Sequence, residues 1–407
     1  MLIFIVKLIG AEGAKTPAGR RDRGDHGGAS AEEAPRTARG KRSAWSGNQQ
    51  PSLTEPNILA CIKCLYSIKM DKEINEGGEK MKISPVEQLY TLFNETALLL
   101  QEELNCTYLE ALAETGENLF QGSILQEDLS ELTVKRIKKQ YEQIQLDKFS
   151  NDEIRKAYQL VILMGMKESV QPNHQMTPDS VGMLVGYLVD RFMKQPSFRL
   201  MDPAVGTGNL LTTVLNHLQR KVASVGVEID DLLIKLAYVN ANLQTHPIEL
   251  FNQDSLEPLF IDPVDAVIGD LPVGYYPNDV RAAEYQVKAS EGHTYSHHIF
   301  IEQSVRHTVP GGYLFFIIPN GLFESDQASL LSGFFKEHVI VQGLLQLPTS
   351  MFNNKNTAKS ILILQKKGEG VLPPKQALLV DLPSLSNAVE MDKILLKMEK
   401  WFQENKG

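Results

Sequence analysis

Three acidic side chains, Asp202, Glu228 and Asp254, stand at the ends of three short apolar runs of the kind that forms buried strands. In open α/β sheets, ligands bind at the carboxyl ends of the strands, where residues in such positions meet. Carboxylates at that edge repel a phosphate and attract a ligand with amino or hydroxyl groups. The sequence therefore predicts a site for a cationic or hydroxyl-bearing ligand.

A glycine-rich turn follows the first of these acids, in the run Asp202-Pro203-Ala204-Val205-Gly206-Thr207-Gly208-Asn209. Gly206 and Gly208 allow the backbone to approach a ligand closely and to adopt positive φ. Glu228 comes 20 residues after Gly208, where an acid accepts both hydroxyls of a ribose. The turn lacks the third glycine of GxGxxG, and Asp202 would repel a pyrophosphate, which argues against NAD.

S-adenosylmethionine (SAM) fits this pattern better, because its amino end suits Asp202 and its adenine amine suits Asp254. The alternative is that each acid only caps a helix. Three acids at successive strand ends favour SAM over that alternative.

The fourth predicted strand ends in Asp270, within the run Gly269-Asp270-Leu271-Pro272-Val273-Gly274-Tyr275-Tyr276. Methyl transfer to a planar amine needs a group that accepts from its N–H and an aromatic wall that holds the base. Asp270 and the Leu271 carbonyl could accept, and Tyr275 or Tyr276 could stack. The alternative is a Pro/Gly turn with two surface tyrosines.

Alternating strands and helices must position these residues, and together they predict a parallel sheet with helices on both faces. The predicted strands are Phe198–Met201, Val222–Ile229, Ile248–Phe251, Val264–Ile268, Tyr313–Ile318, Val339–Leu347 and Ser360–Lys366. The predicted helices are Leu210–Gln219, Leu232–Leu243, Ile299–Thr308, Leu322–Glu337 and Leu385–Phe402. The last two strands lack a helix between them, which indicates an antiparallel closing pair.

Before the sheet, apolar residues at helical spacing predict an all-helical domain over residues 81–172. Its helices are expected from Ser84, over Tyr108–Phe120, over Glu127–Leu146 and over Asp152–Glu168. Thr177 and Pro178 are then expected to cap and open a helix that runs to about Met193. The basic residues Lys135, Arg136, Lys138 and Lys139 are expected to form a solvated face, with phosphate contact as the alternative.

Residues 1–80 differ from the rest, because they are rich in Gly, Ala, Arg and Ser and show no regular periodicity. We interpret them as disordered or as a non-native extension, with translation starting at Met81. Glu-Gly-Gly-Glu at 76–79 could be encoded by a ribosome-binding site. A lone Cys61-Ile-Lys-Cys64 pair is weak support for zinc.

Composition excludes several classes of protein. The chain has 407 residues, 41 basic and 50 acidic side chains, and three cysteines. A net charge of -9 excludes a strongly basic coat for nucleic acid, and so few cysteines exclude a disulfide scaffold and indicate a reducing compartment. No apolar run approaches the roughly 18 residues of a membrane span.

His297 and His298 are adjacent on a helix and point apart, so no metal is predicted. Lys355 and Lys359 are expected to be solvated.

From about Asn173 to Lys367 the chain resembles class I SAM-dependent methyltransferases of the N6-adenine type. It is most similar to the modification subunits of type I restriction systems. The resemblance lies in Thr177-Pro178, the Asp202–Gly208 loop, Glu228, Asp254, the run from Gly311 to Gly321 and Leu347-Pro348 with Phe352. Two features depart from it: Leu271 and Val273 replace a proline and an aromatic of the family's catalytic signature, and no segment resembles a target-recognition domain.

The resemblance implies a Rossmann-like seven-stranded sheet with the last strand antiparallel, preceded by a smaller helical domain. The expected domains are residues 1–80, 81–172, 173–384 and a C-terminal helix over 385–407. The expected cofactor-binding residues are Thr177, Asp202, Pro203, Ala204, Gly206, Gly208, Asn209, Glu228, Ile229, Asp254, Ser255 and Asp270. The expected catalytic residues are Asp270, Pro272, Tyr275 and Tyr276.

These observations predict a cytoplasmic SAM-dependent methyltransferase that acts on an amino nitrogen, in the manner of adenine-N6 DNA methylases. A partner could supply recognition of DNA or RNA. Two alternatives stay open at this point. One is a methyltransferase for a protein or small-molecule amide, and the other is an inactive regulator that binds SAM or nucleic acid.

Overall fold

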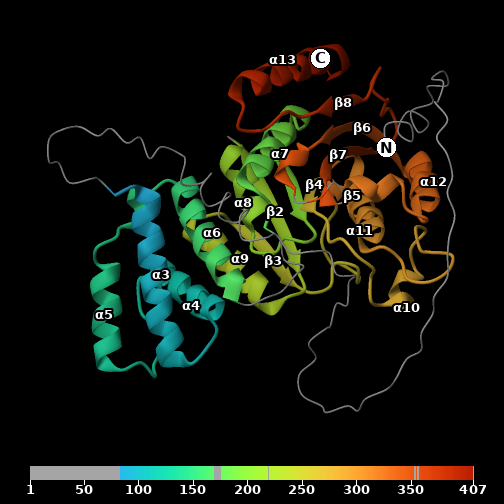
Figure 1. Ribbon diagram of the computed structural model, residues 1–407. Coiled ribbons are helices and arrows are strands. Elements are labelled where there is room, and N and C mark those ends of the chain that lie inside the picture. Colours follow the sequence, from blue (N-terminus) through green and yellow to red (C-terminus); the bar gives the residue numbers. More distant parts are fainter. Residues whose placement is uncertain (1–82, 169–175, 219, 353, 355–356, 407) are drawn as a thin grey trace.

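An eight-stranded sheet forms the centre of the computed structural model, which describes residues 83–168, 176–218, 220–352, 354 and 357–406 (Figure 1). The strands are β1 (Ser197–Asp202), β2 (Lys221–Glu228), β3 (Ile248–Asn252), β4 (Val264–Asp270), β5 (Thr308–Pro319), β6 (Val339–Gln346), β7 (Lys359–Lys366) and β8 (Leu378–Asp381). Their order is β3-β2-β1-β4-β5-β7-β6-β8. The proposed extension 1–80, with its two cysteines, and Met81 lie outside the described residues.

Every pairing in the sheet is parallel except those of β7, which runs antiparallel to both β5 and β6. This confirms the predicted α/β methyltransferase fold and the antiparallel pair near its end. The predicted count of seven strands is wrong, because β8 adds an eighth strand parallel to β6. With four residues, β8 is too short to show an alternating pattern.

Helices cover the two faces of the sheet and bury one apolar cluster on each (Figure 1). One face holds α7 (Asp179–Phe192), α8 (Asn209–His217) and α13 (Ala388–Lys406). The other holds α11 (Ser296–Arg306) and α12 (Ala328–His338). The short helix α10 (Asp279–Ala282) lies in the loop before α11. None of the helices in the described ranges is long and apolar enough to cross a membrane.

Four helices form the region before the sheet: α3 (Pro85–Leu104), α4 (Tyr108–Gln121), α5 (Glu131–Tyr141) and α6 (Asn151–Glu168). They do not close a core of their own. Their apolar cluster includes Leu233, Leu236, Val239 and Leu243 of α9 (Asp231–Leu243), which belongs to the sheet region. The division into domains at 172/173 stays a prediction, because residues 169–175 are not described.

Two predicted helices are shorter than expected. The helix expected over Glu127–Leu146 is α5, followed by a turn and a single 3-10 turn at Leu146–Lys148. The helix expected over Leu322–Glu337 begins only at Ala328, after a separate 3-10 turn at Asn320–Phe323. In both places the apolar spacing extends over neighbouring residues that are not part of the α-helix.

The contact between α4 and α9 depends on a glycine, and this gives a testable prediction. A Cβ at Gly116 would lie 2.2 Å from Val239 Cγ1. We expect Gly116→Ala to lower the free energy of unfolding by about 1–3 kcal/mol, because the two helices must separate or repack. Urea unfolding measures the change. The control is Gly333→Ala in α12, where nothing lies within 4 Å of the added Cβ. That variant should gain up to about 1 kcal/mol, and equal effects at both sites would contradict the prediction.

Candidate active site

The glycine-rich loop joins β1 to α8 at the carboxyl edge of the sheet. Gly206 and Gly208 have φ of +54° and +77°, which glycine adopts without strain. Gly208 precedes the first turn of α8, and a Cβ there would lie 3.3 Å from Ala237 Cβ. In contrast, nothing lies within 4 Å of a Cβ placed on Gly206. The loop is therefore tight against α9 on one side and open on the other.

Asp202 ends β1 and is 1% exposed. Its carboxylate accepts a hydrogen bond of 3.1 Å from the Ala204 backbone N–H. Burial raises the pKa of Asp202 to about 8, and the nearby charges of Glu228 and Asp270 add to the rise, against the opposing effect of the Ala204 bond. A buried carboxylate with two acidic neighbours is a site that a cation would stabilise.

Glu228 ends β2 and holds the loop in place. Its Oε2 accepts from the Gly206 N–H at 3.0 Å, and its Oε1 accepts from the backbone N–H of Ile229 and Asp230 at 3.0 and 3.1 Å. Ile229 beside it is 50% exposed. The predicted ribose acid thus lies directly against the glycine turn, with an exposed apolar side chain next to it.

The acid after β3 is joined to the loop after β4. Asp254 Oδ1 accepts from the Leu256 N–H at 2.9 Å, and its Oδ2 accepts from the Tyr276 hydroxyl at 2.6 Å. Ser255 is buried, and its hydroxyl donates to the Pro203 carbonyl. Tyr276 is 3% exposed, so it is not one of two surface tyrosines. Its hydroxyl is bonded to the predicted adenine-side acid, which leaves Tyr275 as the better placed tyrosine for an acceptor wall.

Asp270 ends β4 and has partners on both oxygens. The Thr177 hydroxyl donates to Oδ2 at 3.0 Å, and the Lys359 ammonium donates to Oδ1 at 2.6 Å. Two expectations from the sequence are therefore wrong. Thr177 does not cap α7, whose N-cap is Pro178 without a side-chain bond. Lys359 is not a solvated turn lysine, since its side chain is 19% exposed and paired. Lys355 lies outside the described residues.

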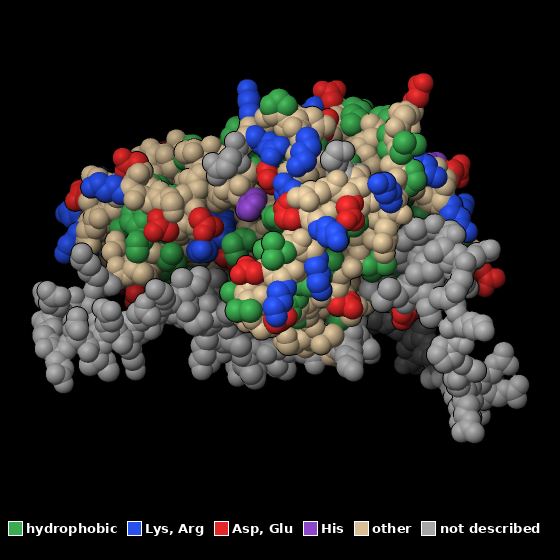
Figure 2. All heavy atoms as spheres, turned by 90° about the horizontal axis from the view of Figure 1, so that it is seen from above, with side chains coloured by type: hydrophobic (Ala, Val, Ile, Leu, Met, Phe, Trp, Pro, Cys, Tyr) green, Lys and Arg blue, Asp and Glu red, His purple; other side chains and the backbone are tan. Residues whose placement is uncertain are grey.

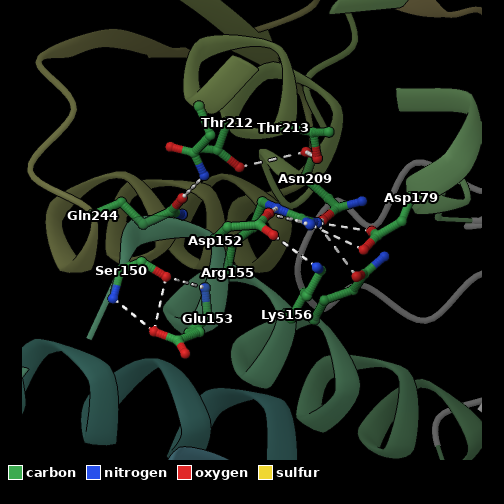
Figure 3. Close-up of polar contacts among 12 residues, drawn as sticks. Ser150, Asp152, Glu153, Arg155, Lys156, Asp179, Asn209, Thr212, Thr213 and Gln244 are labelled. Carbon is green, nitrogen blue, oxygen red and sulfur yellow. Dashed lines mark hydrogen bonds and ion pairs between the residues drawn. The ribbon is translucent and has the colours of Figure 1, made fainter. Parts of the chain in front are cut away.

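A buried arginine from the helical region ties this site together, and sequence reasoning missed it (Figure 3). Arg155 of α6 is 0% exposed. It donates to both oxygens of Asp179 at 2.8 and 2.9 Å and to Asn209 Oδ1 at 3.0 Å. Asn209 in turn donates to the Thr177 carbonyl at 3.1 Å. The first residues of α7 and α8 are thus fixed by one side chain from outside the sheet region.

The loop after β4 is attached to the start of α11 by backbone and aromatic contacts. Tyr276 N–H donates to the Thr294 carbonyl, and Ser296 N–H donates to the Gly274 carbonyl, both at 2.8 Å. Tyr275 stacks on Tyr295 with ring centroids 4.7 Å apart, and Tyr295 stacks on His297 at 5.1 Å. Burial lowers the pKa of His297, against the effect of its hydrogen bond to the Pro272 backbone. Burial also lowers the pKa of His298, to about 4, so both rings are neutral at pH 7.

The missed residues left little signal in the sequence. Arg155 reads as an ordinary helix residue, and Tyr295 directly precedes α11 without any motif. Lys359 was accessible to a topological argument, because β7 runs antiparallel and its first residue pairs with Pro319 at the end of β5. That register places Lys359 at the same edge as Asp270.

The residues at this edge fit SAM, by two observations. The open space in front of Gly206 leaves room for a ligand at the loop, and the buried Asp202 lacks a cationic partner among the contacts described above. Asp202 would hold the amino group, Glu228 the ribose hydroxyls and Asp254 the adenine side. Within the described residues, no group of three or more His, Cys, Asp or Glu side chains could hold a metal ion.

The charges at the surface are mixed. On the face seen in Figure 2, blue Lys and Arg side chains are interspersed with red Asp and Glu side chains among the described residues. This agrees with the net charge of -9. Nucleic acid at this face would meet local basic groups rather than a continuous basic field.

Comparison with known proteins defines the family. A model described as N-6 DNA methylase matches residues 150–405, and one described as the YtxK N-terminal helical domain matches residues 87–166. The chain belongs to the N-6 DNA methylase family, and its fold is that of class I SAM-dependent methyltransferases.

Individual relatives agree with this assignment. The chain is 51% identical over 329 residues to the uncharacterized protein YtxK of Bacillus subtilis (strain 168), covering 80% of this chain and 100% of the relative. A crystal structure described as a class I S-adenosylmethionine-dependent methyltransferase from Listeria monocytogenes is 46% identical. It matches with a TM-score of 0.73 over 78% of this chain and 99% of that one. The type I restriction-modification methyltransferase subunit from Streptococcus thermophilus shares the fold, at 17% identity and a TM-score of 0.54 over 76% and 74% of the two chains.

Proposed function

We propose that this protein uses SAM to methylate the amino nitrogen of adenine in nucleic acid. The observation that carries the proposal is the set of carboxylates at the ends of β1, β2 and β4, around a glycine loop with open space in front of it. The N-6 DNA methylase family and the SAM-dependent relative support it. Asp202, Glu228 and Asp254 are proposed to bind the cofactor, with Pro203, Ala204, Gly206, Gly208, Asn209, Ile229 and Ser255 shaping its pocket.

In this proposal the protein mainly positions the reactants. SAM held by Asp202, Glu228 and Asp254 would supply an electrophilic methyl group for transfer to the lone pair of the acceptor amine. Asp270 accepts an N–H of the amine and so aims its lone pair, and it passes the released proton to solvent. Thr177 keeps the Asp270 carboxylate in one orientation. Tyr275, stacked on Tyr295, provides an aromatic surface for the base. Pro272 shapes the loop between Asp270 and Tyr275.

The test is calorimetric titration of the full chain with SAM, followed by transfer of a labelled methyl group. DNA and RNA oligonucleotides, casein and free glutamine serve as acceptors. The proposal is supported if SAM binds with a micromolar Kd, which is a binding free energy of about -8 kcal/mol, and the label appears in adenine. Label only in casein or glutamine would favour an amide methyltransferase instead. Binding without any transfer would favour an inactive regulator.

Asp270→Ala separates cofactor binding from transfer. We expect transfer to fall by about 100-fold or more, because the acceptor amine loses its hydrogen-bond partner. SAM affinity should change by less than about tenfold, since Asp202 and Glu228 remain. Single-turnover transfer and calorimetry measure the two quantities. Unchanged turnover would exclude Asp270 from the reaction.

The cellular setting is also part of the proposal. We infer a cytoplasmic enzyme from the low cysteine count and the nucleic-acid substrate. The type I restriction-modification relatives are subunits of larger systems, and a partner that reads the target sequence is proposed here by analogy.

A further inference from the structure

Lys359 and Asp270 form an ion pair at the residue proposed to hold the methyl acceptor. Lys359 is the first residue of β7 and Asp270 the last of β4, so both side chains lie at the carboxyl edge of the sheet. The ammonium nitrogen is 2.6 Å from Oδ1, and the two side chains are 19% and 17% exposed. The pair is thus held by the fold but still reaches the solvent side of the site.

Each member of the pair can make a further hydrogen bond. An ammonium has three N–H donors, and a carboxylate has about four lone-pair positions. Their contacts with each other and with Thr177 use one donor of Lys359 and one position on each oxygen of Asp270. The pair therefore offers one donor and one acceptor side by side to an incoming group.

Such a pair complements a group with an N–H next to an acceptor atom. Lysine ammonium and arginine guanidinium groups carry no acceptor atom, and Lys359 would repel their charge at short range. Adenine has the required arrangement, because its amino group and ring nitrogen N1 are bonded to the same carbon. A neutral amidine edge meets this requirement, as does a primary amide, and membership of the N-6 DNA methylase family favours the amidine.

We propose that Lys359 is a specificity-determining residue that donates a hydrogen bond to adenine N1 while Asp270 accepts from the adjacent amino group. This inference rests on the proposed function and deepens it. Two hydrogen bonds fix the base in its plane, so the amine lone pair is directed by geometry rather than by one flexible contact. Lys359 keeps its proton throughout and takes no part in bond making.

The experiment compares the full wild-type chain with Lys359→Met. The acceptors are oligonucleotides with adenine, 1-deazaadenine or 7-deazaadenine at the methylated position. For the wild type, 1-deazaadenine should lower kcat/KM by about 10- to 100-fold, the usual effect of losing one partner of a bidentate base contact. The 7-deaza base should cost less than about threefold. Lys359→Met should lose a similar factor on adenine and no longer distinguish adenine from 1-deazaadenine.

Lys366→Met, at the other end of β7, is the matched control, because Lys366 donates to the Thr308 carbonyl far from Asp270. Calorimetry with SAM tests whether Lys359→Met still folds and binds, with an expected change below about threefold. Equal use of adenine and 1-deazaadenine by the wild type would overturn the inference alone. So would a Lys359→Met variant that keeps the full 1-deaza penalty. Absence of transfer to any adenine by the wild type would instead overturn the proposed function, and the inference with it.

Discussion

Replacing Arg155 with methionine is expected to lower the free energy of unfolding by about 3–5 kcal/mol, the usual cost of breaking a buried ion pair. Arg155 is fully buried, and Asp179 would be left 10% exposed without its bidentate partner. Asn209 would lose its partner as well. A loss of this size is a large part of the stability of an ordinary protein. Urea unfolding with circular dichroism measures the change.

The same variant tests whether the helical region matters for the cofactor. SAM should protect the wild type against urea by an amount set by its affinity, and Arg155→Met should show less protection because the starts of α7 and α8 are no longer tied together. The protection of Arg155→Lys by SAM should lie between those of the wild type and Arg155→Met, since one ammonium group cannot replace the planar guanidinium. The control is Arg199→Met, whose partners Glu249 and Asp262 are 61% and 89% exposed, and which should cost less than about 1 kcal/mol. A loss below 1 kcal/mol for Arg155→Met would contradict the role given to this network.

Asp202→Asn is expected to change binding and stability in opposite directions. SAM affinity should fall by about 100-fold or more, because a buried carboxylate no longer meets the amino group of the ligand. The unliganded protein should become more stable. In the folded chain the pKa of Asp202 is about 8, against 3.8 as the ordinary value. The folded state therefore binds more protons between these values, and stability falls as pH rises from about 4 to 8.

Removing the carboxylate removes that pH-dependent loss. The melting temperature of Asp202→Asn should exceed that of the wild type by about 2–4 °C at pH 8, with the difference vanishing near pH 4. SAM binding to the wild type should release a proton below pH 8, because a cation favours the ionised carboxylate. Calorimetry in two buffers of different ionisation enthalpy measures the release, which the variant should lack. A variant that is less stable at pH 8 and keeps its SAM affinity would refute the site.

The architecture of the sheet could be predicted because each unit of it is local. The strand that ends in Asp202, the glycine turn and the helix after it follow one another within about 20 residues, and their signals are those of any α/β unit. The strand β8 could not be predicted, because four residues at the edge of a sheet are defined by their neighbour β6 rather than by their own pattern.

The site was predictable only in part, for a related reason. Acids at strand ends identify one edge of the sheet, but the partner of each acid comes from far away in the chain. Thr177 and Lys359 reach Asp270 across 93 and 89 residues. A sequence pattern gives no distance between such segments. The contact between Tyr276 and Asp254 spans 22 residues, and it too requires knowing how the loop after β4 turns.

The apolar seam between α4 and α9 has a consequence for how the chain is made. Synthesis proceeds from the N-terminus, so α3 to α6 leave the ribosome well before α9 does. Leu112 of α4 and Leu236 and Val239 of α9 belong to one cluster, in which the first is separated from the others by more than 120 residues of sequence. Until α9 has emerged, the apolar side chains of the early helices that pack against it stay exposed to solvent. We therefore expect the nascent helical segment to stay loosely packed, and to become rigid only when α9 completes this apolar cluster.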